Sequence, residues 1–428
     1  MESSKLYLDA LKSALKPAWG CTEPLTVALA SAHARAWCQG DICSLDIEVS
    51  ANLYKNAAGV FVPGTGMTGL TIAAAAGWFG GDAKAGLEVL AHLESDPLRR
   101  AKSMLAHQKV QVRYIEHEDV FYTRLEAHTT DEQCVVKMGG QHDHLVSVEL
   151  NGGLMLEQPM LCSSISQKLN DGWQVAEIVS FCETVNLDEL GVVQQSADLN
   201  SALSQAGLKT SYGLAIGLGL QQQQQNGFIS NDLSSRAMIA SAAASDARMA
   251  GATLPAMSNS GSGNQGIAAT MPVVAVADAI NADFEHRLRA LTMSHLLAVY
   301  IKKMQTPLSA LCAATTAAMG AAAAINWLLG GTLKQIEETI RYMVGDISGI
   351  YCDGAKPGCA LKVSTGASAA VKAALLGLSG KAPRADGVLE QSVDASLANL
   401  GKLTFDSLKA TDQQIVHWIA ERQSLIVS

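Results

Sequence analysis

The sequence predicts a predominantly helical α+β protein, in which a helical core domain carries a small inserted antiparallel β-sheet unit. Hydrophobic residues make up 48% of the 428 residues but aromatic residues only 5%, so the apolar content suits closely packed helices. Alternating strand-like runs are concentrated between residues 109 and 150, and helical patterns dominate from about residue 175 onward. We therefore expect an N-terminal helical part (1–105), an inserted β unit (106–172) and a C-terminal helical domain (173–428).

The N-terminal part is expected to contain three helices and one strand. Residues 4–16 place leucines at helical spacing, and residues 24–38 form a second periodic apolar run. Residues 45–50 alternate like a half-buried strand. The segment 62–66 has the composition of a turn, and it should open an alanine-rich helix that ends near Gly77.

The inserted unit is expected to be an antiparallel meander of about four strands. Turn signals separate its alternating runs, which are Val110–Ile115, Val120–His128, Cys134–Met138 and Leu145–Leu150. Asn151-Gly152-Gly153 is expected to close this meander.

Charge and composition exclude several classes of partner. The net charge of −9 and pI of about 5.6, without a long basic run, argue against nucleic acid and anionic membrane surfaces. The N-terminus has no apolar signal core, and the uncharged run 304–333 is alanine-rich, which favours a buried helix over a membrane span. Nine cysteines, an odd number in an acidic chain, fit a reducing cytosol. We expect a cytoplasmic homodimer, because alanine-rich helical surfaces often pair.

Three cysteines near the C-terminal end predict a soft metal centre. Cys352 and Cys359 flank a glycine-rich loop, and Cys312 lies 40 residues upstream of Cys352 (352 − 312) in the uncharged run. Three thiolates leave one position of a tetrahedral or cubane site open for chemistry. The spacing of the two loop cysteines is not that of a zinc finger or a ferredoxin. Five other cysteines are expected to be ordinary buried or half-buried thiols: Cys38, Cys43, Cys134, Cys162 and Cys182.

A fourth cysteine is placed where its thiol could react. Cys21 lies in Gly20-Cys21-Thr22-Glu23-Pro24, where Thr22 is expected to cap a helix and Pro24 to lie in its first turn. A thiol just ahead of a helix N-terminus is easier to ionise and could be a base, a nucleophile or a metal ligand. A small buried residue at a helix entry is the alternative.

The loop at residues 258–266 predicts an anion site. Glycines alternate there with hydroxyl and amide side chains ahead of an apolar helix, so backbone N–H groups could bind a carboxylate or phosphate. A plain linking loop is the alternative. The string also resembles the carboxylate loop of pyridoxal-phosphate eliminases, but no lysine occurs between Thr210 and Ile301 to form their Schiff base.

Lys55 is a candidate partner for a substrate carboxylate. It lies in Asn52-Leu53-Tyr54-Lys55-Asn56, shortly before the Pro63–Gly66 turn. A solvated lysine is the default interpretation. The turn is not a phosphate-binding P-loop, because no Gly-Lys-Ser/Thr follows it.

Together these motifs resemble the L-cysteine desulfidase family, which belongs with the alpha chain of bacterial iron–sulfur L-serine dehydratases. The resemblance rests on four motifs in order along nearly the whole chain: Gly20–Pro24, Leu53–Ala57, Ser260–Gly266 and Cys352–Lys362. It implies an oxygen-sensitive [4Fe–4S] cluster with three cysteine ligands and one free iron. Cys312 and Cys352 match two ligands about forty residues apart, and Cys359 matches the third, although the dehydratase loop is longer there.

The resemblance also implies a reaction, the β-elimination of L-cysteine to sulfide, ammonia and pyruvate. Cys21, or Glu23, would remove the α-proton, although Cys21 could instead be a ligand. The substrate carboxylate would bind Ser260, Ser262, Gly263, Asn264 and Gln265, with help from Lys55. L-Serine dehydration by the same mechanism and a non-catalytic metal-binding protein are the alternatives.

Overall fold

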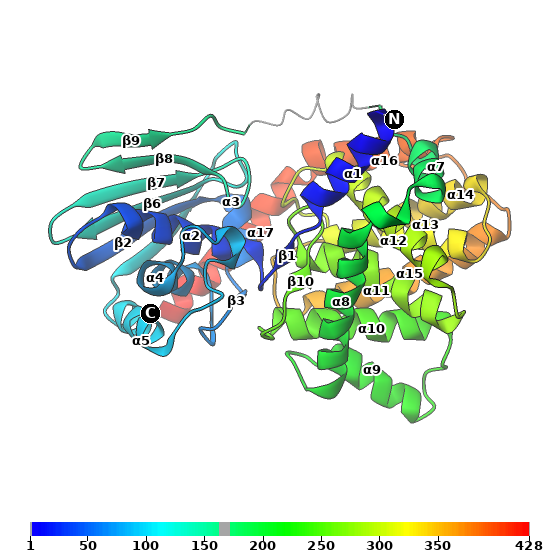
Figure 1. Cartoon of the computed structure of the whole chain (residues 1–428), viewed down its shortest axis with the longest axis horizontal. Coiled ribbons are helices and arrows are strands. Elements are labelled where there is room, and N and C mark those ends of the chain that lie inside the picture. The colour runs from blue at the N-terminus through cyan, green and yellow to red at the C-terminus, as the bar shows by residue number, and fades with distance from the viewer. Residues whose placement is uncertain (1, 162–171, 428) are drawn as a thin grey trace. The chain divides into compact units, whose positions relative to one another are not determined.

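The computed structural model describes residues 2–161 and 172–427 and divides into two compact units. The helical unit comprises Met1–Pro17, Ile165–Cys352 and Pro357–Lys409. The sheet unit comprises Ala18–Ser164, Asp353–Lys356 and Ala410–Ser428. The fold is predominantly helical with one larger sheet, which confirms the predicted α+β class (Figure 1).

Helices make up most of the helical unit. They are α1 (Glu2–Ala14), α7 (Val175–Thr184), α8 (Gly191–Lys209), α9 (Ile216–Gln225), α10 (Leu233–Met249), α11 (Gly263–Ala279), α12 (Phe284–Lys303), α13 (Ala313–Leu328), α14 (Leu333–Ile347), α15 (Cys359–Leu378) and α16 (Val393–Lys402). Shorter elements are the 3₁₀-helix η2 (Leu187–Glu189), the π-helical segment η3 (Leu403–Ser407) and the strand β10 (Ala256–Met257). Polar side chains cap the N-termini of several helices by accepting hydrogen bonds from N–H groups of the first turn. Asp232 does so for α10 and Asp283 for α12.

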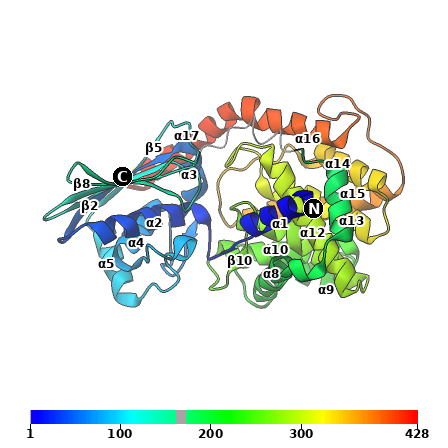
Figure 2. The same cartoon turned by 45° about the horizontal axis from the view of Figure 1, so that its top comes forward.

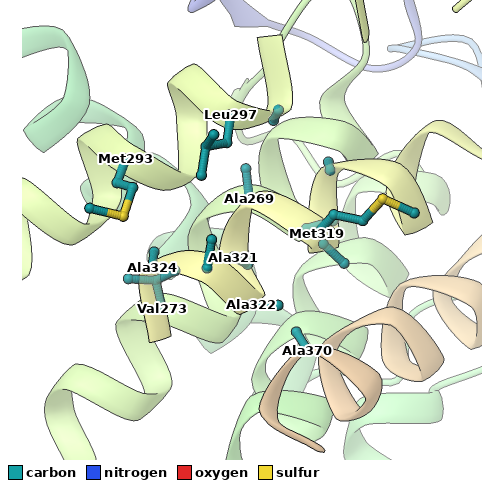
Figure 3. Close-up of a cluster of buried hydrophobic side chains, with 14 of the residues drawn as sticks. Ala269, Val273, Met293, Leu297, Met319, Ala321, Ala322, Ala324 and Ala370 are labelled. Atoms are coloured by element: carbon teal, nitrogen blue, oxygen red, sulfur yellow. The ribbon is translucent and has the colours of Figure 1, made fainter. Parts of the chain in front are cut away.

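The core of this unit is built from small side chains around α13. Figure 3 shows Ala321, Ala322 and Ala324 of α13 among side chains of α11, α12 and α15. Glycines let the backbones approach closely: a Cβ added to Gly320 would lie 2.4 Å from the carbonyl oxygen of Ser294 in α12. A Cβ added to Gly366 of α15 would lie 3.2 Å from the Cβ of Ala318 in α13. The uncharged run 304–333 is therefore mainly a buried helix of the core, as predicted.

The sheet unit contains one six-stranded sheet. Its strands are β2 (Ile42–Ser50), β5 (Val110–Ile115), β6 (Thr123–Thr129), β7 (Gln133–Met138), β8 (Leu145–Leu150) and β9 (Gly153–Glu157), in the order β5-β2-β6-β7-β8-β9. The helices are α2 (Thr22–Trp37), α3 (Ala51–Ala57), α4 (Leu70–Gly80), α5 (Ser95–Ala106) and α17 (Lys409–Val427), the last beginning at the boundary of the units. Smaller elements are β3 (Phe61–Val62), β4 (Met67–Thr68) and η1 (Gly86–Glu88), and β1 (Pro17–Ala18) spans the point at which the chain passes from one unit to the other. Helix α2 packs on β6 and β7, and α4 packs on α2 (Figure 2).

Two details of the predicted meander are wrong. The run Val110–Ile115 pairs in parallel with β2, because a helical crossover through α3, α4 and α5 joins the two strands. Asn151 and Gly152, both with positive φ, do not close the meander but form the hairpin turn into a further strand, β9. The sheet thus combines β2, from the expected N-terminal part, with strands from 106–172.

Among the described residues, one helix is long and apolar enough to cross a membrane by length and composition, namely α15. Over half of its apolar window is buried inside the protein. It packs on α10, α13 and α14, so it has the surroundings of a core helix.

Candidate functional site

The helical unit brings the three predicted metal-binding cysteines into one neighbourhood. Cys312 is the N-cap residue of α13, and Cys359 is the first residue of α15. Cys352 is brought near Cys312 because the residues beside them, Leu311 and Tyr351, form an antiparallel bridge, in which Cys312 faces Ile350 and Cys352 faces Ala310. In this bridge the Cys312 N–H donates to the Ile350 carbonyl oxygen at 3.0 Å and the Cys352 N–H donates to that of Ala310 at 2.6 Å.

The thiols interact electrostatically. Burial first, and then repulsion from Cys352 and Cys359, raises the pKa of the Cys312 thiol to about 12, while N–H groups at the start of α13 act in the opposite direction. Cys312 is buried, and the other two thiols are half-buried. A thiol with so high a pKa stays protonated at neutral pH unless a metal ion displaces its proton.

The donor set therefore fits a soft metal or an iron–sulfur centre in its chemistry. Three cysteines lie together, two of them at helix N-termini, where the macrodipole favours the negative charge of a thiolate or an anionic cluster. The side chains do not form a finished coordination shell: in residues 2–161 and 172–427, no group of three or more His, Cys, Asp or Glu side chains has an arrangement that could hold a metal ion.

The loop before α11 forms a two-residue hairpin turn that leads directly into the helix. Ser260 and Gly261 have φ values of 48° and 83°, and Asn259 and Ser262 exchange backbone hydrogen bonds of 3.0 Å across them. The Ser262 hydroxyl caps α11 by accepting from the Gln265 N–H at 3.3 Å. Gly263 and Asn264 carry the other N–H groups of the first turn, which fits the predicted anion site.

A buried polar network holds this turn in place. Asn259 Nδ2 donates to His295 Nδ1 at 3.1 Å, and Asn259 Oδ1 accepts from Gln265 Nε2 at 3.0 Å. The hydroxyls of Ser196 and Thr270 donate to carbonyl oxygens, so both can accept from His295 Nε2. Burial lowers the pKa of His295 to about 3, so its imidazole is neutral at physiological pH. His295 is thus a packed residue that supports the turn.

In the sheet unit, Cys21 occupies the N-cap position of α2. The helix already includes Thr22, so the residue in the capping position is Cys21 and not Thr22, as had been predicted. The Cys21 sulfur makes no capping hydrogen bond. Cys21 is 3% exposed. It lies at the positive end of a 16-residue helix, which is the placement from which a reactive thiol was predicted.

Glu23 belongs to a buried polar cluster that the sequence did not reveal. Its carboxylate accepts from Asn56 Nδ2 at 3.2 Å and from the Thr22 hydroxyl at 3.3 Å. The imidazole of His142 lies 3.3 Å from the Thr22 hydroxyl and 3.0 Å from that of Thr26. Burial lowers the pKa of His142, against the opposing effect of the Glu23 carboxylate. His142 lies in the turn between β7 and β8, where its sequence neighbours indicated only a turn.

Lys55 is buried in the sheet unit and is not the solvated lysine of the default interpretation. Lys55 is 1% exposed, and its side chain forms an ion pair with Asp412 of α17. The Asn56 carbonyl oxygen accepts from the Ala355 N–H at 3.2 Å, so the Lys55 motif contacts the middle of the loop between Cys352 and Cys359. Gly354 has a φ of 95°, and a Cβ there would lie 2.3 Å from the Lys55 carbonyl oxygen. Three sequence motifs therefore meet around Lys55 and Asn56.

The matching family model, the serine dehydratase alpha chain, covers residues 84–417. The chain belongs to the serine dehydratase alpha chain family. It is also 46% identical over 422 residues to the UPF0597 protein YhaM of Salmonella gallinarum and of Escherichia coli O127:H6, with 97% of each chain covered. It is 44% identical over 417 residues to a UPF0597 protein of Actinobacillus pleuropneumoniae serotype 5b, covering 97% of this chain and 96% of the relative.

Membership of the serine dehydratase alpha chain family confirms the wider group that the motifs indicated and supports a lyase related to serine dehydration. The matched region contains the turn before α11 and all three cysteines, but it begins after Cys21, Glu23 and Lys55. Within this family, the specificity for L-cysteine and the roles of individual residues stay predictions. Of the cysteines expected to be ordinary buried or half-buried thiols, Cys38, Cys134 and Cys182 are buried, and Cys162 lies outside the described residues. The expectation is wrong for Cys43, which is exposed at the start of β2.

Proposed function

We propose that this protein is a β-eliminating lyase that converts L-cysteine to pyruvate, ammonia and sulfide, using a [4Fe–4S] cluster. The observation that carries the proposal is the neighbourhood of Cys312, Cys352 and Cys359, whose thiols interact with one another. These three residues would hold the cluster. When bound, it would supply a Lewis-acidic iron, which suits a soft sulfur leaving group.

The residues of the chain would bind the amino acid and move its proton. The start of α11, from Ser260 to Gln265, would bind the substrate carboxylate through backbone N–H groups. Cys21, or Glu23 as the alternative, would remove the α-proton, and a positioned base typically contributes a factor of about 10²–10⁴. The Cα–H and Cβ–S bonds then break, sulfide leaves, and the resulting aminoacrylate adds water to give pyruvate and ammonia.

Lys55 was predicted to help bind the carboxylate. Its ion pair with Asp412 means that it would have to exchange one carboxylate for another to do so. This makes Lys55 the least supported member of the proposed set.

A homodimer and a cytoplasmic location also stay predictions.

L-Serine dehydration is the second candidate, because the matching family model is described as the serine dehydratase alpha chain. The two substrates differ by one atom, and pockets discriminate modestly between such isosteres. Anaerobic protein with its cluster should therefore be assayed for pyruvate release from L-cysteine and L-serine side by side. A larger kcat/KM for L-cysteine supports the desulfidase, a larger value for L-serine supports the dehydratase, and no pyruvate from either refutes a lyase acting on these amino acids.

A non-catalytic metal-binding protein is the remaining alternative. Iron, zinc and acid-labile sulfide should be measured in protein made without oxygen. Iron with matching sulfide supports the proposal, and zinc alone supports a structural site.

A further inference from the structure

A chain of buried hydrogen bonds connects Glu23 to His142 in the sheet unit. The Thr22 hydroxyl lies 3.3 Å from Glu23 Oε2 and also 3.3 Å from His142 Nε2. On the other side of the imidazole, Nδ1 lies 3.0 Å from the Thr26 hydroxyl. None of these four residues is more than 9% exposed. A carboxylate and an imidazole are therefore linked through one hydroxyl group inside the protein.

The Thr26 hydroxyl determines which nitrogen of the imidazole carries the hydrogen. It donates to the Thr22 carbonyl oxygen at 3.2 Å, one turn earlier in α2. Its oxygen therefore faces His142 as an acceptor, which places the single hydrogen of the neutral ring on Nδ1. Burial lowers the pKa of His142, so the ring is neutral at physiological pH and its Nε2 is an acceptor.

The Thr22 hydroxyl thus lies between two acceptors. It carries one hydrogen, so it cannot donate to the Glu23 carboxylate and to His142 Nε2 at the same time. One added proton removes this conflict. Nε2 would then donate to the Thr22 oxygen, and the Thr22 hydroxyl would donate to the carboxylate. A proton that arrives at Glu23 can consequently move to His142 by a shift of two hydrogens along the chain.

The surroundings of His142 favour a positive charge on the ring against the effect of burial. The carboxylates of Glu23, Asp143 and Asp119 all raise the pKa of His142, and Glu23 has the largest effect of the three. The ring of Phe121 packs edge-on against the imidazole, with 4.8 Å between the ring centroids. The imidazolium would be desolvated, but it would have a carboxylate at the other end of the same hydrogen-bond chain.

We propose that Glu23 and His142 form one acid–base pair, in which Thr22 passes a proton from the Glu23 carboxyl group to His142 Nε2. The inference rests on the proposed function, where Glu23 is one of two candidate bases, and it selects Glu23 over Cys21. The substrate Cα–H bond breaks and Glu23 gains the proton. Glu23 then protonates the Thr22 oxygen while Thr22 gives its own hydrogen to Nε2, which leaves a carboxylate, a hydroxyl and an imidazolium. His142 does not touch the substrate and acts only through Thr22.

The first experiment locates the hydrogens by ¹⁵N NMR of the full-length protein with labelled histidine, using His142→Gln to assign the resonances. At neutral pH, His142 should carry hydrogen on Nδ1 and none on Nε2. In Glu23→Gln the Thr22 hydroxyl no longer faces a carboxylate, so the Nε2 resonance should move toward that of a more strongly hydrogen-bonded nitrogen. In Thr22→Val it should move the opposite way. Hydrogen on Nε2 of the neutral ring, or an Nε2 resonance that ignores both substitutions, would refute the shared hydrogen.

The second experiment measures pyruvate formation by anaerobic protein with its cluster. Thr22→Val and His142→Gln should each lower kcat at least about tenfold with little change in KM, because the proton path acts after the substrate is bound. Thr22→Ser restores the hydroxyl and should recover kcat. The matched control is His144→Gln in the same turn, where Nε2 lies 3.0 Å from the Pro159 carbonyl oxygen. It should leave kcat unchanged.

The two experiments separate this inference from the proposed function. Full kcat in Thr22→Val or in His142→Gln would refute the inference and leave the lyase standing. Thr22→Ser that is as slow as Thr22→Val would also refute it, because the loss would then be structural. A wild type that forms no pyruvate from L-cysteine or L-serine would refute the lyase, and the ¹⁵N resonances would still decide whether Glu23 and His142 share the Thr22 hydrogen.

Discussion

The substitution Asp412→Asn is predicted to destabilise the sheet unit strongly. Lys55 is 1% exposed and Asp412 is 8% exposed, and the two form an ion pair. Removing one partner of a buried pair leaves an uncompensated charge, which typically costs about 3–5 kcal/mol. A domain is stabilised by only about 5–15 kcal/mol in total, so this single substitution should remove at least about a fifth of the folding free energy. Urea unfolding followed by circular dichroism should show an early transition.

Two matched variants define what this result means. Asp346→Asn breaks the surface pair with Lys372, whose side chains are 39% and 57% exposed, and should cost no more than about 1 kcal/mol. The double variant Lys55→Met/Asp412→Leu removes both charges and should recover most of the lost stability. If Asp412→Asn is as mild as Asp346→Asn, the assignment of Lys55 as a buried, paired cation is incorrect. Full lyase activity in the double variant would exclude Lys55 from the reaction.

Three further predictions address other parts of the molecule. Cys312→Ser should abolish iron and sulfide incorporation in protein prepared without oxygen, and full cluster content in that variant would contradict the ligand assignment. Burial raises the pKa of Asp246 to about 6, above its ordinary value of 3.8, so its ionisation destabilises the folded protein by an amount that is zero below about pH 4, grows between about pH 4 and 6 and is constant above that. Asp246→Asn keeps an acceptor for the Gly217 N–H and should gain stability relative to the wild type between about pH 4 and 6. Parallel pH–stability curves would refute this. Gly354→Ala should destabilise the protein by more than about 1 kcal/mol, because the φ of Gly354 is 95° and the new methyl group would meet the Lys55 carbonyl oxygen. An unchanged urea midpoint would contradict the described conformation of the loop at Gly354.

Helices and strand positions could be predicted largely from local patterns. Periodicity and composition indicated α1, α2, α4 and the strands β2, β5, β7 and β8 close to their observed ranges. The pairing of β5 with β2 could not be predicted in this way. Whether a strand joins its sequence neighbour or a distant strand depends on where the intervening helices pack, and no short pattern encodes that packing.

The candidate site also contains some residues that could be predicted from the sequence and others that could not. The cysteines and the turn before α11 are recognisable because thiols and glycine-rich loops have characteristic chemistry that can be identified within a few residues. Asp412 and His142 are single residues of common types, each far in sequence from the motif that it supports. Only the fold shows that Asp412 neutralises Lys55 and that His142 lies beside Thr22. Their surroundings in the sequence contain no signal that would have singled them out.

The close approach of α13 and α15 has a consequence for how the protein tolerates change. Where Gly366 of α15 meets Ala318 of α13, only a hydrogen and a methyl group lie between the backbones, so no flexible side chain can absorb a shift at that point. One added carbon deep in this layer would move a whole helix and, with it, the cysteine at its first turn. Variants that weaken the proposed metal centre should therefore also arise at glycine and alanine positions remote from any sulfur atom, and a mutational scan that inspects only the cysteines would overlook them.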